Sequence, residues 1–569
     1  MTAGSFRDLS ALLNPRTIAV VGASERHGSA GRLVLENLRH LGYRGTVYAV
    51  RPSVQKGQKV LGFPCYPDLK SLSGPVDLVA VLLAAEKVLP ILETAVEIGA
   101  QAAWVFASGF AEAGPEGKAR QADLVRFAEE TGLMVCGPNC IGVANLVDRV
   151  ATYSAALGPT TRAGGVSAVV QSGAICLGLA NAARFGFRYL ISSGNEAVLD
   201  RADYIGYLIN DPHTRVIVAF LEGIRSPQKF VAAAQAAALA GKPILLVKVG
   251  RSEIARQAVQ AHTGSLAGSD VVIDAVLRRL GVTRLDSLDE LVEAAELFLS
   301  YSPPHGEGVG LLSLSGGQIG LIADLAQELG LEFPPLSEEA QQALTEVLPP
   351  YSTIANPLDA WGSGDLERTY PACVEIVARE EDVHLLAVAR DSPPQVAYRE
   401  VEQSLAVAKA AVQAAGETGK PVLVFSNLSA GFRQEVKKVL DGGGVPYLQG
   451  TWETLRAIRA FVRYGCFRRR MGEPAVNGCP STLSEAALRT GPSAVSEAAL
   501  RAGPSTVSEA ALRAGLRLPW GKSSQSAVPS PIPTSICSMP TYAPCPSACQ
   551  ANYTSAALVW PEATSTALR

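Results

Sequence analysis

The 569-residue sequence is poor in histidine and aromatic residues, and it has no excess of charge of one sign. Six histidines occur, aromatic residues make up 6% of the chain, and 50 basic and 53 acidic side chains leave a net charge of −3. Because the two signs are interspersed, no basic face is available to follow a nucleic-acid backbone. Small molecules are therefore the expected ligands.

Long hydrophobic runs are also missing. Glycine, proline or a charged residue interrupts every apolar run before the ~20 residues that would span a bilayer. The N-terminus leads directly into a strand-like segment and lacks the basic and apolar regions of a signal peptide. We therefore expect a cytoplasmic protein that does not bind membranes.

The ten cysteines show no pattern of a disulfide framework. Two Cys-x3-Cys pairs, Cys136/Cys140 and Cys545/Cys549, have neither the spacing of a zinc site nor companion histidines. No metal site is predicted.

Short apolar runs alternate with longer amphipathic stretches as far as residue 465, a pattern typical of β-α-β units and mostly parallel sheets. With 48% apolar residues and this length, the chain should form several α/β domains. We predict three consecutive doubly wound domains at residues 10–145, 150–300 and 305–465. The predicted strands are 17–23, 46–52, 76–83, 102–108 and 133–139 in the first series and 165–173, 189–196, 216–223, 243–250 and 281–287 in the second. The third series starts at 308–320, where a strand turns into a helix, and contains 384–390, 421–427 and 445–450.

Residues 471–569 differ in character. Three LSEAALR-like repeats begin at residues 483, 495 and 507, and their 12-residue period is too short for a solenoid unit. Residues 519–569 are rich in Ser, Pro, Thr and Ala, a composition that predicts disorder. No chemistry is assigned to this tail.

The segment VVGASERHGSAG lies where the first predicted strand gives way to a helix. Gly22 allows a sharp turn, and Ser24 and the following amides face a ligand phosphate at the helix N-terminus. The G-x-G-x-x-G spacing of dinucleotide sites is absent, and Arg51 stands where such a site has an acidic residue. A phosphorylated nucleotide fits better; a tight turn without ligand is the alternative.

One histidine has a distinctive setting: His262, in QAHTGSLAGSD. Small neighbours let another molecule approach the ring, and neutral imidazole is both a good nucleophile toward phosphorus and a good leaving group. Amides after the predicted strand at 165–173 lie at a helix N-terminus and would hold a phosphate, and Glu222 ends a parallel strand where it can accept the other imidazole N–H. The alternatives are a loop histidine and a solvated glutamate. A serine hydrolase is disfavoured because the first glycine of its nucleophile elbow is missing before Gln171.

The string at residues 17–52, with SGFAE (108–112) and GPNCIGVAN (137–145), resembles the CoA-binding domain of NDP-forming acyl-CoA synthetases. This family includes the ADP-forming acetate–CoA ligases and is related to succinyl-CoA synthetase. The resemblance covers residues 10–300 and, more weakly, extends to 465. It implies a Rossmann-like CoA-binding domain followed by two flavodoxin-like ligase domains. The CoA-binding residues that it implies are Gly22, Ser24, Arg26, Arg51, Ser108, Gly109, Phe110, Pro138, Asn139 and Cys140. The sequence departs from the family at Arg51-Pro52, where Asn-Pro is more usual.

The resemblance also implies that His262 is transiently phosphorylated and that Glu222 steadies it. Two helix N-termini would cradle the phosphate, through Ser172, Gly173 and Ala174 and through Ser315, Gly316 and Gly317. Around the second one, LSLSGGQIG stands for the family's N-A-G-G-P-G, and ANPLDAWG matches its N-P-x-D segment, with Asp359 as a possible contributor. Ordinary turns are the alternative there.

The sequence contains no G-x-x-x-x-G-K-[ST] loop, and its tail is too short and too polar to form an ATP-grasp domain. The chain therefore resembles an α subunit that interconverts acid, CoA and ATP with acyl-CoA, ADP and phosphate together with an ATP-grasp β-type subunit. That partner would supply ATP/ADP and Mg²⁺, and an oligomer is expected. The rival interpretation is a non-catalytic CoA-binding scaffold that has lost its ATP-grasp domain. The acyl group cannot be read from the sequence.

Overall fold

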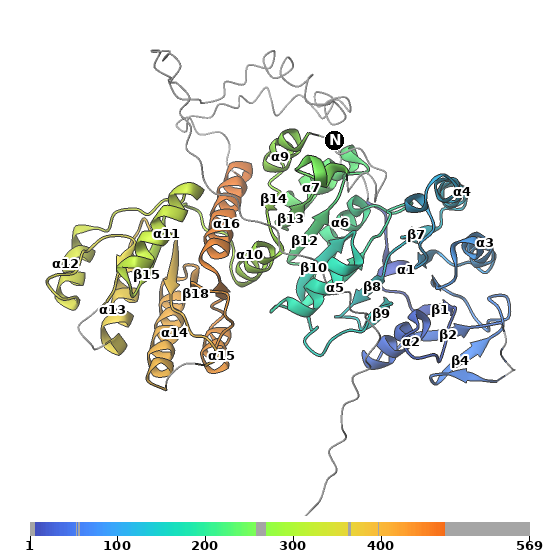
Figure 1. Ribbon diagram of the computed structural model, residues 1–569, viewed down its shortest axis with the longest axis horizontal. Coiled ribbons are helices and arrows are strands. Elements are labelled where there is room, and N and C mark those ends of the chain that lie inside the picture. The colour runs from blue at the N-terminus through green and yellow to red at the C-terminus, as the bar shows by residue number, and fades with distance from the viewer. Residues whose placement is uncertain are drawn as a thin grey trace, which may run out of the picture. The chain divides into compact units, whose positions relative to one another are not determined.

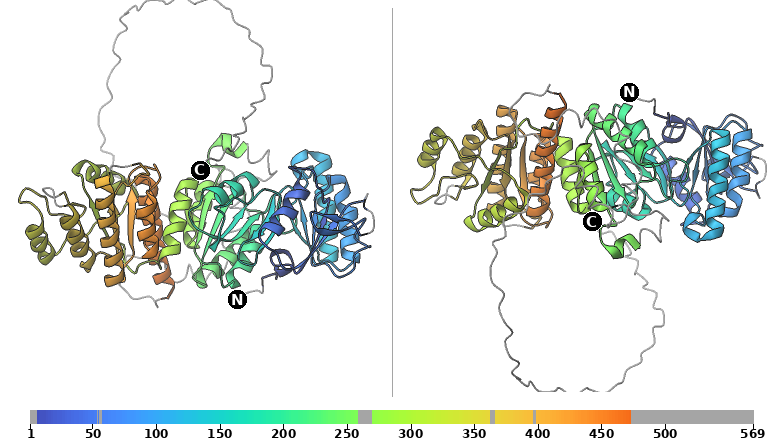
Figure 2. Two further views of the ribbon diagram at one scale, coloured as in Figure 1. Left: turned by 90° about the horizontal axis from the view of Figure 1, so that it is seen from below. Right: turned by 90° about the horizontal axis from the view of Figure 1, so that it is seen from above.

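The computed structural model describes residues 6–52, 54, 57–257, 269–361, 366–395 and 398–472. These residues form three sheets made mostly of parallel strands, with helices packed on their faces (Figures 1 and 2). This arrangement confirms the predicted α/β class. Within the described residues, no helix combines the length and apolar character needed to cross a bilayer.

The first sheet has the strand order β3-β4-β2-β1-β5-β6-β7. From β4 to β7 this is the Rossmann order 3-2-1-4-5-6, so the order reverses between β1 and β5. Alternate residues of β1 pack into two different cores, which is why the strand is apolar throughout. The strands are β1 (Thr17–Val21), β2 (Thr46–Val50), β3 (Lys59–Val60), β4 (Phe63–Tyr66), β5 (Leu78–Val81), β6 (Ala102–Val105) and β7 (Met134–Cys136). The helices are α1 (Ser10–Leu13), α2 (Ala30–His40), η1 (Ala85–Lys87), α3 (Val88–Glu97), η2 (Ala111–Ala113) and α4 (Pro115–Thr131).

The second sheet has the order β14-β13-β12-β10-β11-β8-β9. Its five parallel strands follow the flavodoxin order 2-1-3-4-5, which reverses between β10 and β12. An antiparallel hairpin, β8 and β9, extends it beyond β11. The strands are β8 (Gly142–Asn145), β9 (Val150–Tyr153), β10 (Ala163–Val170), β11 (Phe187–Ser192), β12 (Val216–Leu221), β13 (Ile244–Lys248) and β14 (Thr283–Leu285). The helices are α5 (Gly173–Ala182), α6 (Arg201–Asn210), α7 (Pro227–Leu239), α9 (Asp270–Arg279) and α10 (Leu288–Ser300).

The third sheet is parallel throughout, in the order β16-β15-β17-β18-β19. This is again the flavodoxin order, and it reverses between β15 and β17. The strands are β15 (Val309–Ser313), β16 (Leu358–Asp359), β17 (Leu385–Ala389), β18 (Val422–Ser426) and β19 (Tyr447–Gln449). The helices are α11 (Gly316–Leu329), α12 (Glu338–Val347), α13 (Leu366–Arg379), α14 (Tyr398–Thr418), α15 (Gln434–Gly442) and α16 (Thr451–Gly472).

Helix α10 packs against α16 and thereby joins the second sheet's helices to those of the third. Three glutamates of α10 are buried in this contact, with exposed fractions of 2% to 8%: Glu290, Glu293 and Glu296. The backbone N–H of Gln449 donates to Glu293 Oε2 at 3.1 Å, and the Arg184 guanidinium pairs with both Glu293 and Glu296. Burial raises the pKa of Glu293 from 4.5 to about 7, against the opposing effect of Arg184.

The raised pKa of Glu293 predicts a pH-dependent stability. Between pH 4.5 and 7 the folded chain binds more protons at Glu293 than the unfolded chain does, so stability falls as the pH rises. Glu293→Gln is expected to remove this fall, which amounts to about 3 kcal/mol over the whole range at ~1.4 kcal/mol per pKa unit. Urea unfolding at about pH 5 and about pH 7.5 measures the difference. Glu375→Gln, at an exposed ion pair with Arg379, is the control. An unchanged pH slope in Glu293→Gln would contradict the assignment.

Candidate functional site

The reversal point of the first sheet is built around Gly22. Its φ of +95° lies in the left-handed region, and a Cβ there would lie 2.6 Å from the carbonyl oxygen of Leu82, which follows β5. At Gly31 a Cβ would lie 2.2 Å from the Gly22 oxygen. Helix α2 therefore begins close against the end of β1, in the position that open α/β sheets use for ligand phosphates.

The polar residues of this loop form hydrogen bonds within the loop. Ser24 Oγ accepts a hydrogen bond from the Arg26 N–H at 3.1 Å, and Ser29 Oγ donates to the Arg26 carbonyl at 2.7 Å. Arg51, at the end of β2, donates its backbone N–H to Tyr66, while its buried Nε has no partner among the described residues. The structure thus brings Gly22, Ser24 and Arg51 to the same edge of the sheet.

The Ser108–Phe110 turn is organised by Glu112, which the sequence analysis did not select. Glu112 Oε1 accepts the N–H groups of Gly109 at 2.6 Å and Phe110 at 3.1 Å, and Oε2 accepts from Asn195 Nδ2. Burial raises the pKa of Glu112, but these hydrogen bonds outweigh burial and lower it. The Phe110 side chain is 1% exposed and belongs to the core, so only the backbone of this turn can border a ligand.

The neighbouring turn at residues 137–140 is tied to the same asparagine. The Pro138 carbonyl accepts the Asn195 N–H at 3.0 Å, and Asn139 Nδ2 donates to Asn195 Oδ1 at 3.3 Å. Cys140 is buried with its Sγ 4.0 Å from Cys136 Sγ, and burial raises the pKa of its thiol well above the usual value. The two predicted CoA-bordering turns are therefore joined through Asn195, and the Cys140 thiol is part of the core.

At the reversal point of the second sheet, Gln171 follows β10 and Glu222 follows β12. The Glu222 N–H donates to Gln171 Oε1 at 2.9 Å, and Glu222 is 8% exposed. Ser172 caps α5 by accepting the Ile175 N–H at 3.4 Å. The amides of the first turn of α5 have no carbonyl four residues earlier in the helix, so they are suited to an anion.

The predicted phosphate carrier, His262, lies outside the described residues, in the segment 258–268. The elements on either side are tied together. Lys248, buried at the end of β13, lies 3.6 Å from Asp270 at the start of α9, and Arg284 donates to both Asp270 oxygens. Burial lowers the pKa of Lys248, with the charge of Asp270 opposing it. Lys248 was not selected from the sequence because it ends a continuous apolar run.

The third sheet presents Ser315, the N-cap residue of α11, at its reversal point. A Cβ at Gly316 would lie 3.2 Å from Asp359 Oδ2, so the Asp359 carboxylate lies beside this helix N-terminus. Gln318 accepts from Ser313 Oγ at 2.6 Å and donates to Asp391 at 3.4 Å. Asp391, which follows β17, was missed by the sequence analysis. Unlike the α5 turn, this turn is accompanied by carboxylates from two strands.

Two known protein families match parts of this chain. Residues 16–145 match the family described as CoA binding domain, and residues 163–298 match the family described as Succinyl-CoA ligase like flavodoxin domain. Within the described residues, no three His, Cys, Asp or Glu side chains form a metal-binding group. Fold and site thus define a CoA-binding protein of the acyl-CoA ligase class.

The similarity to individual proteins is more specific. The chain is 30% identical to the α subunit of acetate–CoA ligase (ADP-forming) I of Pyrococcus furiosus, over 82% of this chain and 99% of that protein. It is 32% identical to acetate–CoA ligase (ADP-forming) I of Archaeoglobus fulgidus, over 80% of this chain and 63% of that protein. A solved acetyl-coenzyme A synthetase 1 of Ca. Korarchaeum cryptofilum, in complex with phosphate and ADP, matches 81% of this chain and 98% of its own, with a TM-score of 0.71 and 29% identity. The chain belongs to the family of ADP-forming acetate–CoA ligases. It spans somewhat less than two thirds of the length of the Archaeoglobus fulgidus ligase.

Proposed function

We propose that this chain is the CoA-binding, phosphohistidine-carrying subunit of an ADP-forming acyl-CoA synthetase. The observation that carries the proposal is the reversal point of the second sheet. There, the backbone N–H of the nearly buried Glu222 donates to the Gln171 side chain, which places this residue next to the strand that leads into the N-terminus of α5. Phosphate transfer through a histidine needs two supports. One is a carboxylate that orients the imidazole, and the other is a set of helix amides that bind the dianion.

The first domain would bind CoA at the reversal point between β1 and β5. Gly22 and Gly31 let the backbone approach a nucleotide phosphate, and Ser24 and Arg26 line the loop before α2. Arg51 would contribute a positive charge through its guanidinium. The turns at Ser108–Phe110 and Pro138–Cys140 would border the arm that ends in the thiol, chiefly with backbone groups.

The reaction is a phosphoryl relay. In the direction of synthesis, His262 accepts the γ-phosphoryl group of ATP, and ADP leaves. The phosphoryl group then passes to the carboxylate of the acid, which frees the imidazole, and the CoA thiolate attacks the resulting acyl phosphate and releases inorganic phosphate. Glu222 would accept the imidazole N–H and keep the ring oriented. The amides of Ser172–Ala174 would hold the phosphate at one stage and those of Ser315–Gly317 at another.

The relay needs an ATP site. We infer that an ATP-grasp β-type subunit supplies it, together with the Mg²⁺ that accompanies the nucleotide. The relatives named as α subunits, which this chain matches over almost their whole length, support a separate partner. The acid is a small carboxylic acid; relatives are named for acetate, 4-hydroxybutyrate and trans-ferulate, so the family name alone does not define it.

The proposal is tested with the purified full chain, γ-labelled ATP and the ATP-grasp subunit of a close relative. Acid-labile label on this chain, and CoA-dependent formation of acyl-CoA from acetate, are expected. CoA should also raise the unfolding temperature of the chain alone. Stabilisation by CoA without labelling by any partner would instead support a non-catalytic CoA-binding scaffold.

A further inference from the structure

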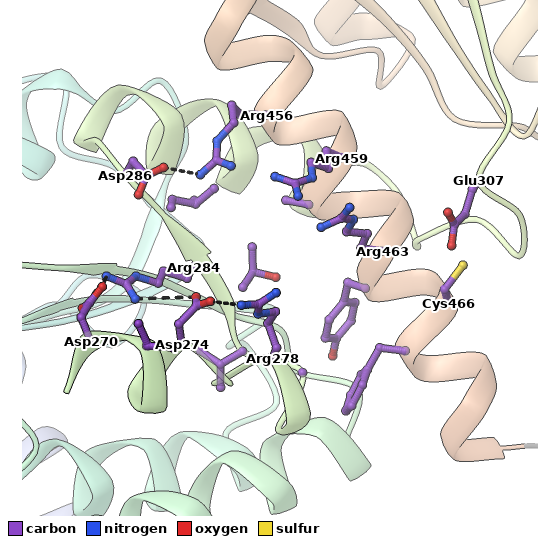
Figure 3. Close-up of a pocket in the computed structure, with 18 of the residues that line it drawn as sticks. Asp270, Asp274, Arg278, Arg284, Asp286, Glu307, Arg456, Arg459, Arg463 and Cys466 are labelled. Carbon is purple, nitrogen blue, oxygen red and sulfur yellow. Dashed lines mark hydrogen bonds and ion pairs between the residues drawn. The ribbon is translucent and has the colours of Figure 1, made fainter. Parts of the chain in front are cut away.

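A cavity of about 770 Å³ lies between α9, β14 and α16 (Figure 3). Ligand sites of small molecules usually fall within about 300–1,000 Å³. The cavity lies along the edge strand of the second sheet, whereas Glu222 and Gln171 follow β12 and β10 in its middle. It therefore lies at a different place along the sheet from Glu222 and Gln171.

Positive charge dominates the walls. Seven arginines and four carboxylates line the cavity: Arg251, Arg278, Arg284, Arg456, Arg459, Arg463 and Arg470, with Asp270, Asp274, Asp286 and Glu307. Three of the carboxylates already form ion pairs with arginines of the cavity wall. Asp270 pairs with Arg284 at 2.8 Å, Asp274 pairs with Arg278, and Asp286 pairs with Arg456 at 2.8 Å and with Arg251.

Arg459 and Arg463, one turn apart on α16, have no direct carboxylate partner, although the charge of Asp286 acts on Arg459 and that of Glu307 acts on Arg463. Neither forms a hydrogen bond or ion pair with any described residue, and Arg459 Nε is buried without a partner. Figure 3 shows both side chains extending from α16 into the cavity, toward Arg278. Burial, followed by the like charges of Arg463, Arg456 and Arg278, lowers the pKa of Arg459 to about 10.

The cavity also has an aromatic wall. The half-buried Phe467 lines it, and its ring centroid lies 6.1 Å from that of Tyr464, which is buried in the core. The Phe467 ring lies against Gly281, where a Cβ would come within 2.1 Å of Cε1, so the backbone at Gly281 leaves room for this ring. The flat face of Phe467 next to guanidinium groups provides what the base and the phosphates of a nucleotide require.

We propose that this cavity binds a nucleotide polyphosphate, with its phosphates between Arg278, Arg459 and Arg463 and its base against Phe467. A diphosphate or triphosphate supplies two or more negative charges to the arginines that lack carboxylate partners. Strand β14 is part of the second sheet and α9 is one of the helices around that sheet, whereas α16 is one of the helices around the third. The ligand would therefore also stabilise the contact between these elements.

The test compares the full chain with the double variant Arg459→Ala/Arg463→Ala, by thermal unfolding and calorimetric titration with ADP, ATP, tripolyphosphate and adenosine at matched ionic strength. ADP and ATP are expected to bind and stabilise the parent chain, more strongly than tripolyphosphate, and binding should weaken with added salt. The double variant should bind at least about tenfold more weakly, since two charged contacts are lost.

Without nucleotide, the double variant should unfold at the same temperature as the parent or higher, because the variant removes like-charge repulsion. A purely structural role of these arginines would lower that temperature instead. Arg379→Ala, at an exposed ion pair on α13, controls for the loss of surface charge. The His262→Ala variant should still bind ADP, which separates this site from the proposed phosphotransfer.

Equal ADP binding by parent and double variant would overturn the proposal. So would stabilisation by adenosine as large as that by ADP, because the arginines would then contribute nothing. Tripolyphosphate binding as tight as that of ATP would contradict the role of the aromatic wall.

Discussion

His262→Ala is expected to abolish acid-labile labelling of this chain by γ-labelled ATP and the partner ATP-grasp subunit. His262 is followed by a run of small residues with two glycines, and the proposed relay passes the phosphoryl group through this imidazole. Acyl-CoA formation should fall to background in the same variant, while stabilisation by CoA should remain. Quench-flow labelling and thermal unfolding give the two readouts.

His213→Ala provides a matched control, since His213 is exposed and follows α6, away from the carboxyl ends of the strands. It should be labelled like the parent chain. Glu222→Gln should slow labelling by about 10- to 100-fold without abolishing it, as expected for a residue that orients another. Full labelling of His262→Ala would overturn the assignment of the phosphate carrier.

Most of the parallel strands could be predicted because a strand buried on both faces is a short continuous apolar run. Several strands were not predicted, for different physical reasons. In β4 the run is interrupted by Pro64, and β16 has two residues that follow the Asn356-Pro357 bond. The hairpin β8–β9 was missed because its residues read as the end of the first series, while β11, the strand that pairs with β8, comes about 45 residues later.

The site was predictable in part for a related reason. The carboxyl ends of parallel strands meet at one edge, so a residue such as Glu222 can be placed from its strand alone. Glu112 and Asn195 could not be placed in this way, because their roles depend on a contact across 83 residues of sequence. The arginines of α16 likewise could not be assigned to a site from the sequence, because the cavity forms only where α9 and β14 pack opposite them.

Gly22→Ala is expected to have the second large effect, a loss of stability of about 3 kcal/mol together with loss of stabilisation by CoA. A left-handed φ costs an alanine about 1–2 kcal/mol, and the new Cβ would meet the Leu82 carbonyl at 2.6 Å. That carbonyl cannot retreat easily, since β1 and β5 pair in the middle of the sheet. Any shift of the turn would also move the start of α2 away from the nucleotide phosphates.

Gly28→Ala is the matched control in the same loop. Its φ of +74° is also left-handed, but no atom lies within 4 Å of the added Cβ. Only the conformational cost of about 1 kcal/mol should remain, and CoA should still stabilise the variant. Urea unfolding gives the stabilities, and thermal unfolding with and without CoA gives the binding. If both variants lost the same stability and both kept CoA binding, the close approach at Gly22 would not be what shapes this site.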